Sequence, residues 1–171
     1  MSFIELAKDR FSVRKFSDKK VEKENLNAIL EASRIAPTGA NCQPQKIYVL
    51  DSPSAIEKIN SLCKCTFGAQ TILMVAYDKK LEWKNPLEDG VSAGVEDASI
   101  VATHMMLEAW ELGIASCWVN FFSPSQVKKA FKLPENEEIV LLLPIGYAAD
   151  DATPAEMHDK SRDLSDMVIT L

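Results

Sequence analysis

A long helical pattern at residues 96–112 constrains the fold of this chain more than any other stretch. Apolar residues recur along one row at helical spacing, and a second apolar row lies beside it. The first row is Ala98, Val101, Met105, Ala109 and Leu112, and the second is Ala102, Met106 and Trp110. Acidic side chains at Glu96 and Asp97 suit the positive N-terminal end of a helix. Because the apolar arc is wide, we expect burial on two sides, against a sheet of the same chain and against another subunit.

Periodicity and the positions of proline and glycine predict the remaining elements. Further helices are expected after Ser2, over residues 23–36, from Pro53 onward and over residues 124–131. Strands are expected over residues 46–50, 71–77, 115–119 and 139–145. The run at 71–77 is apolar throughout, which indicates a central strand, whereas 37–44 and 79–90 have the composition of loops.

Length and composition predict one globular domain over residues 1–171. The chain has 171 residues, of which 47% are hydrophobic and 26% charged, which excludes a disordered chain. Residues 159–171 are expected to form a C-terminal arm. The last five residues, MVITL, are too apolar for a free end, so we expect this arm to dock on a second subunit.

The charge balance excludes some classes of partner. With 19 Lys+Arg against 25 Asp+Glu, the net charge is -6, whereas proteins that hold nucleic acid through phosphate contacts are normally basic. No apolar run is long enough to span a bilayer, and the first residues lack the apolar block of a signal peptide. We therefore expect a soluble, cytoplasmic protein that binds neither nucleic acid nor membrane.

Few residues are available for metal or nucleophilic chemistry. The chain has two histidines, His104 and His158, and four cysteines, of which only Cys63 and Cys65 are close in sequence. Neither common phosphate-binding glycine motif is present. We predict no metal site, and we expect the cysteines to be buried free thiols.

Two basic segments carry groups that suit an anion. Arg10, Ser12 and Arg14 place two guanidinium groups and a hydroxyl within five residues, and both groups bind phosphate oxygens well. Lys160 and Arg162 lie two residues apart, so in an extended chain they point the same way. Taken singly, the first segment also reads as a basic helix end and the second as a solvated tail.

The loop at residues 37–44 (PTGANCQP) combines rigidity with amide and hydroxyl groups and little bulk. Taken alone, it also reads as a structural turn.

In this order, the segments resemble the nitroreductase family of flavoproteins. Residues 10–16 (RFSVRKF) resemble its R-x-S-x-R-x-F element, and 36–44 (APTGANCQP) its A-P-S/T-x-x-N-x-Q-P loop. Residues 111–118 (ELGIASCW) and 143–147 (LPIGY) resemble two later motifs, and Lys160 and Arg162 fall at its basic K-x-R. The resemblance covers nearly the whole chain.

The resemblance implies an α+β fold with a mainly antiparallel central sheet flanked by helices. It also implies a homodimer that exchanges its C-terminal arms and binds FMN at the subunit interface. The residues implied to hold the FMN phosphate are Arg10, Ser12, Lys160 and Arg162, with Phe11 in the same segment. Arg14 is implied to face the pyrimidine edge of the flavin, where a cation stabilises negative charge.

Two further groups of cofactor-binding residues follow from the same resemblance. Those implied to approach FMN from the other subunit are Pro37, Thr38, Gly39 and Asn41. Those implied to lie near flavin N5 and O4, through their backbone amides, are Asn120 and Phe121.

The resemblance implies an oxidoreductase with ping-pong kinetics. NADH or NADPH gives a hydride to FMN and leaves before a small acceptor, such as a nitroaromatic or a quinone, enters the same cleft. No side chain needs to act as an acid or base, so no catalytic residue is predicted. Two alternatives stay open: an FMN carrier or sensor without efficient turnover, and a thiol redox protein that uses Cys63 and Cys65.

Overall fold

The computed structural model describes residues 2–171. In chain order its helices and strands are α1 (Phe3–Asp9), α2 (Lys23–Ile35), β1 (Gln45–Leu50), α3 (Pro53–Leu62), β2 (Thr71–Asp78), α4 (Gly94–Glu111), β3 (Ala115–Ser116), α5 (Pro124–Phe131) and β4 (Glu137–Gly146). Short 3-10 turns occur at η1 (Gly39–Asn41) and η2 (Leu164–Asp166). Across the described residues, every helix is too short or too polar to cross a membrane.

The four strands form one sheet in the order β1-β2-β4-β3, and all neighbours are antiparallel. β2 is central, as the apolar run predicted, because it pairs with β1 from Gln45↔Tyr77 to Leu50↔Ile72 and with β4 on its other side. A bulge interrupts the β2–β4 pairing at Val75/Ala76. The prediction of an α+β fold around a mainly antiparallel sheet is therefore confirmed.

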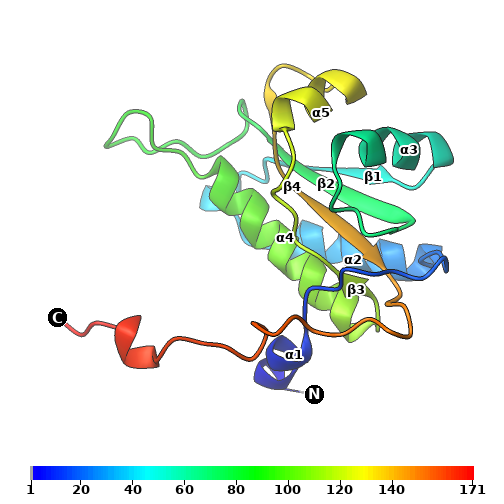
Figure 1. The fold of residues 1–171 in the computed structure, drawn as a ribbon. Helices are drawn as coiled ribbons and strands as arrows, with labels where there is room; N and C mark the ends of the chain where they lie inside the picture. The colour runs from blue at the N-terminus through cyan, green and yellow to red at the C-terminus, as the bar shows by residue number, and fades with distance from the viewer. Residues whose placement is uncertain (1) are drawn as a thin grey trace.

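Helices cover both faces of the sheet, and each face has its own apolar core. α2 and α4 lie on one face, while α3 and α5 lie toward the other (Figure 1). Side chains alternate along β2, so Ile72 and Met74 join the core under α3 and α5, and Leu73 and Val75 join the core under α4. Each fully buried side chain of this kind contributes about 1.5–3 kcal/mol relative to exposure. This burial on both sides explains why residues 72–76 of β2 are all apolar.

Helix α4 crosses the sheet, as predicted, and begins two residues before the expected start. Its first residue, Gly94, has no room for a side chain, because a Cβ there would lie 2.2 Å from Cε2 of Tyr77. Its end is followed by Gly113, whose φ of +73° suits a residue without a side chain. The apolar rows bury against the sheet and α2, whereas Val95 and Ile100 stay exposed. Contact of α4 with another subunit stays a prediction.

The predicted strand at residues 115–119 is shorter in the structure, where β3 ends at Ser116. Cys117 still donates its N–H to the carbonyl of Pro144 at 3.1 Å, but proline has no N–H to give back. The ladder therefore breaks beside Pro144, and pairing resumes only at Val119, which exchanges two hydrogen bonds with Leu142.

The N-terminal segment and the tail meet at the β3 edge of the sheet. Val13 donates its N–H to the Ser116 carbonyl at 3.0 Å, and Ala149 donates to the Lys15 carbonyl at 3.0 Å. The tail then leaves beside α1 and runs away from the rest of the chain, drawn in red (Figure 1). Its apolar side chains are exposed, including Leu164, Ile169 and Leu171.

Candidate functional site

The first basic segment is held extended beside β3. α1 ends at Asp9, and the Arg10 N–H closes its last turn on the Leu6 carbonyl at 3.1 Å. Beyond this point the side chains alternate, with Val13 fully buried in the core. Ser12 and Arg14, on either side of Val13, therefore point to the opposite side, toward the surface.

These residues line a small hollow together with the start of the tail. We call it the basic hollow; its volume is about 160 Å³, and its walls are Arg10, Phe11, Ser12, Arg14, Ala155, Met157 and His158. The structure thus brings four of the predicted site residues into one wall. Two guanidinium groups and a hydroxyl around a recess suit the oxygens of a phosphate group.

A second hollow of about 420 Å³ adjoins the basic hollow, since both are lined by Arg10 and His158. Its remaining walls are Ala7, Lys8, Asp159 and Ser161. Ser161 stands between the two predicted tail cations, so the basic part of the tail does meet the N-terminal segment. The Arg162 Nε atom lies 4.0 Å from Asp166 Oδ2, and joint contact of Lys160 and Arg162 with one anion stays a prediction.

Edge-to-face aromatic contacts support the wall that both hollows share. The Phe11 ring lies edge-on to Trp110 of α4 at 5.3 Å and to His158 at 6.0 Å between ring centroids. Trp110 in turn donates its Nε1–H to Asp9 Oδ2 at 2.9 Å. In the sequence Trp110 is only a member of an apolar row and His158 only a lone histidine, so neither pattern revealed this role.

The polar loop at residues 37–44 lies at the other end of α4. Gly39 donates its N–H to Asp97 Oδ1 at 2.8 Å, and Thr38 Oγ1 accepts the Gln43 N–H at 3.0 Å. Ala40, Asn41 and Gln43 all have positive φ, which matches the rigid turn that the sequence predicted. Asp97 is only 2% exposed, so it anchors this loop in addition to complementing the helix dipole.

Within a single chain, the loop and the basic segment pack near opposite ends of α4. One is tied to Asp97 and the other packs on Trp110, and these two residues lie about 20 Å apart along α4. The structure therefore places these two groups of predicted site residues near opposite ends of one helix.

Asn120 and Phe121 lie farther along the sheet edge that carries Ser116. The Asn120 side chain accepts the Trp118 Nε1–H at 2.6 Å and donates to the Val140 carbonyl at 2.8 Å. The Phe121 ring is 83% exposed. The Asn120 side chain is thus already hydrogen-bonded within the protein, and the Phe121 side chain faces solvent. A contact of their backbone amides with flavin stays a prediction.

The four cysteines are free thiols, as expected, but only Cys63 and Cys117 are buried. Burial raises the pKa of Cys63, and it raises the pKa of Cys117 although Arg14 and Arg10 act in the opposite direction. A raised pKa reduces the thiolate fraction, which is the reactive form. The thiol redox reading gains no support from this geometry. Across residues 2–171, no cluster of three or more His, Cys, Asp or Glu side chains is arranged to hold a metal ion.

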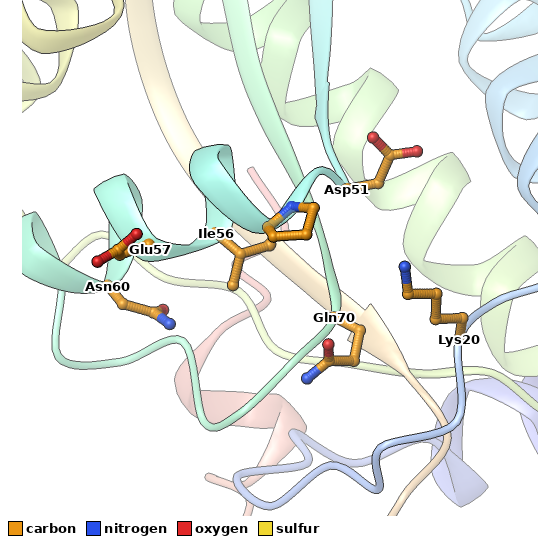
Figure 2. Close-up of a pocket in the computed structure, with 7 residues that line it drawn as sticks. Lys20, Asp51, Ile56, Glu57, Asn60 and Gln70 are labelled. Carbon is orange, nitrogen blue, oxygen red and sulfur yellow. The ribbon is translucent and has the colours of Figure 1, made fainter.

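A third hollow, of about 390 Å³, lies beside α3 and contains none of the predicted site residues (Figure 2). It is lined by Lys20, Asp51, Pro53, Ile56, Glu57, Asn60 and Gln70. Two carboxylates and one lysine line it, so this hollow lacks the excess of cations that distinguishes the basic hollow.

Comparison with known proteins decides the family. A sequence model of the nitroreductase family matches residues 7–67 and 62–147 of the chain. The chain belongs to the nitroreductase family. The nitroreductase family protein of Clostridium difficile 630 has 42% sequence identity, and each chain covers 100% of the other, with a TM-score of 0.92. The nitroreductase fold predicted from the ordered motifs is therefore confirmed.

Of two further relatives, one is named for an activity and the other was solved with a bound cofactor. A protein of Archaeoglobus fulgidus, provisionally named NADH dehydrogenase/NAD(P)H nitroreductase, is 29% identical over 160 residues, which is 88% of each chain. A provisionally named nitroreductase of Exiguobacterium sibiricum, solved in complex with FMN, has a TM-score of 0.82 and 23% identity. The match covers 100% of this chain and 98% of that nitroreductase, and it shows the same fold.

Proposed function

We propose that this nitroreductase-family protein binds FMN and passes electrons from NADH or NADPH to a small acceptor, such as a nitroaromatic or a quinone. The basic hollow carries this proposal, because its donors fit the phosphate of FMN in a chain of this family. The relatives support it, since one is named as an NAD(P)H nitroreductase and another was solved with FMN. When bound, FMN supplies the two-electron redox chemistry.

The roles of the chain's own residues follow from their chemistry. Arg10 and Ser12 hold the phosphate with a charged fork and a hydroxyl, and Lys160 and Arg162 add charge from the tail. Arg14 places a guanidinium near the pyrimidine edge, where it favours the reduced, more negative cofactor. Phe11 keeps this wall in place through its contacts with Trp110 and His158.

We further propose that the site is completed by a second copy of the chain. The polar loop lies about 20 Å from the basic segment along α4, so the loop of one chain and the hollow of another are better placed to share one cofactor. The tail favours such a dimer because Leu164 is 71% and Ile169 80% exposed in the single chain. Burial of these side chains against a partner removes a large apolar area from water.

The absorption spectrum of the purified protein tests the proposal. We expect a yellow protein whose flavin absorbance falls when NADH or NADPH is added without oxygen and returns when a quinone is added. Steady-state rates should give the parallel double-reciprocal lines of a ping-pong mechanism. A colourless protein that also fails to bind added FMN contradicts the proposal. A yellow protein that both nicotinamides reduce only slowly is instead an FMN carrier or sensor.

A further inference from the structure

His158 occupies a position that the phosphate site described above does not use. It is half-buried and lines both the basic hollow and the second hollow, and Arg10 is the other residue that lines both. The imidazole thus lies where the N-terminal segment and the tail meet, next to the principal phosphate-binding arginine.

The local structure holds this imidazole in place. His158 sits in a tight turn, in which its N–H donates to the Ala155 carbonyl at 2.8 Å and the Lys160 N–H donates to Met157 at 3.2 Å. Its ring packs edge-on against Phe11 at an interplanar angle of 65°. Because Phe11 rests on Trp110 of α4, the imidazole is braced from the body of the protein.

The charges that face His158 come from three elements. Lys8 comes from α1, Arg10 and Arg14 from the extended segment, and Asp159 from the tail itself. The Asp9 carboxylate is engaged by Trp110. Cations therefore prevail around the imidazole, so the lining of the two hollows suits a bound anion.

We propose that His158 is a further phosphate-binding residue of the cofactor site and that its protonation makes FMN affinity depend on pH. This inference rests on the proposed function, since it assumes that the hollow takes the FMN phosphate. Imidazole is the side chain that ordinarily changes charge between about pH 5 and 8. Loss of this proton as pH rises therefore weakens the hold of the site on FMN.

The imidazole and the phosphate group change FMN affinity in opposite directions as pH rises. The phosphate gains its second negative charge near about pH 6, which strengthens its attraction to arginine as pH rises. Loss of the imidazolium proton acts in the opposite sense and weakens binding above that pH. Wild-type affinity for FMN therefore rises to a maximum and then falls, on the order of tenfold for the loss of one charged hydrogen bond.

Titration of FMN and of riboflavin into the apoprotein, from about pH 5.5 to about 8.5, tests the inference. His158→Gln should lose the fall above the maximum, whereas in His158→Lys affinity should rise as the phosphate ionises and then stay high, because the lysine charge does not change. The control is His104→Gln. His104 is the second of the two histidines and is also half-buried, but it lies on α4 with Nδ1 2.8 Å from the Ile100 carbonyl. It should behave as wild type. Riboflavin lacks the phosphate and should show no such fall in any variant.

The outcomes distinguish this inference from the proposed function. If wild type prefers FMN over riboflavin but His158→Gln keeps the same fall with pH, His158 is not the titrating group and the inference is wrong. If none of the proteins binds FMN, the proposed function and the inference fail together. Circular dichroism of each variant shows whether the fold is retained.

Discussion

The two ends of α4 carry different chemistry. Around Trp110, two arginines, a hydroxyl and the tail surround a hollow, whereas around Asp97 a buried carboxylate anchors a loop of backbone amides and small polar side chains. Cations suit a phosphate group, and uncharged donors suit the ring of a flavin. We propose that these two regions are half-sites of complementary character, the cationic half-site and the amide half-site, and that a second copy of the chain completes the site.

Deletion of residues 164–171 should have the largest effect. We propose that this part of the tail holds together the two chains that each contribute one half-site. Each fully buried Leu, Ile or Val contributes about 1.5–3 kcal/mol, so loss of both tails should weaken dimerisation by several kcal/mol. Analytical ultracentrifugation across a concentration series measures the change. A truncated protein that dimerises as tightly as wild type would show that the tail does not dock on a partner.

Arg10→Ala tests the cationic half-site. We expect FMN affinity to fall by about 1.5–3 kcal/mol, roughly 10- to 150-fold, because a charged hydrogen bond to phosphate is lost. Riboflavin affinity should stay the same, so the preference for FMN over riboflavin should collapse. Fluorescence titration of both ligands gives this ratio. Equal losses for both ligands would place Arg10 away from the phosphate.

Asp97→Ala tests the amide half-site. The Gly39 N–H loses its buried acceptor, and we expect unfolding free energy to fall by about 1–3 kcal/mol. Asp97→Asn keeps an acceptor oxygen and is the matched control, with a smaller loss. In both variants the preference for FMN over riboflavin should survive, unlike in Arg10→Ala. Urea denaturation measures stability, and equal losses in the two variants would contradict the anchoring role of this hydrogen bond.

Tyr147→Phe gives a smaller effect at a position outside both half-sites. The Tyr147 hydroxyl donates to Glu22 Oε2 at 2.5 Å, and this contact is the main reason that the pKa of Glu22 falls from 4.5 to about 2. A lowered folded-state pKa stabilises the protein above pH 4.5, and the stabilisation is lost as pH falls toward 2.

The difference in urea midpoint between wild type and Tyr147→Phe should therefore be present at neutral pH and shrink below pH 4.5. FMN binding at neutral pH should be unchanged, which makes this variant a baseline for the other two. A difference that stays constant down to low pH would mean that the hydroxyl acts through something other than the ionised Glu22.

The sequence predicted the elements of the fold well because local signals determine most of them. The starts of α3 at Pro53 and of α5 at Pro124 follow from proline in the first turn, and α4 follows from its apolar rows. The end of β3 was missed because it depends on Pro144, a partner in a different strand. The antiparallel order came from the family resemblance, since periodicity does not reveal which strands pair.

The site was predictable only in part, because several of its residues meet through contacts between segments that are far apart in the sequence. Arg10, Ser12 and Arg14 form a short motif, and the motif indicates a phosphate. Asp97 contacts Gly39 across 58 positions of sequence, and Trp110 contacts Asp9 across 101, so no local pattern contains them. The role of His158 could not be predicted, because a single histidine that belongs to no motif does not indicate a function. Contacts of this kind become visible only when the fold brings distant segments together.

A mixed-dimer experiment tests most directly whether one cofactor site is built from opposite ends of α4 in two chains. Arg10→Ala chains and Thr38→Ala/Asn41→Ala chains carry different affinity tags, are refolded together, and the mixed dimers are isolated and titrated with FMN. We predict that each mixed dimer has one site with wild-type affinity, because both defects fall in the other site. Mixed dimers with only weakened sites would contradict a site shared between two chains.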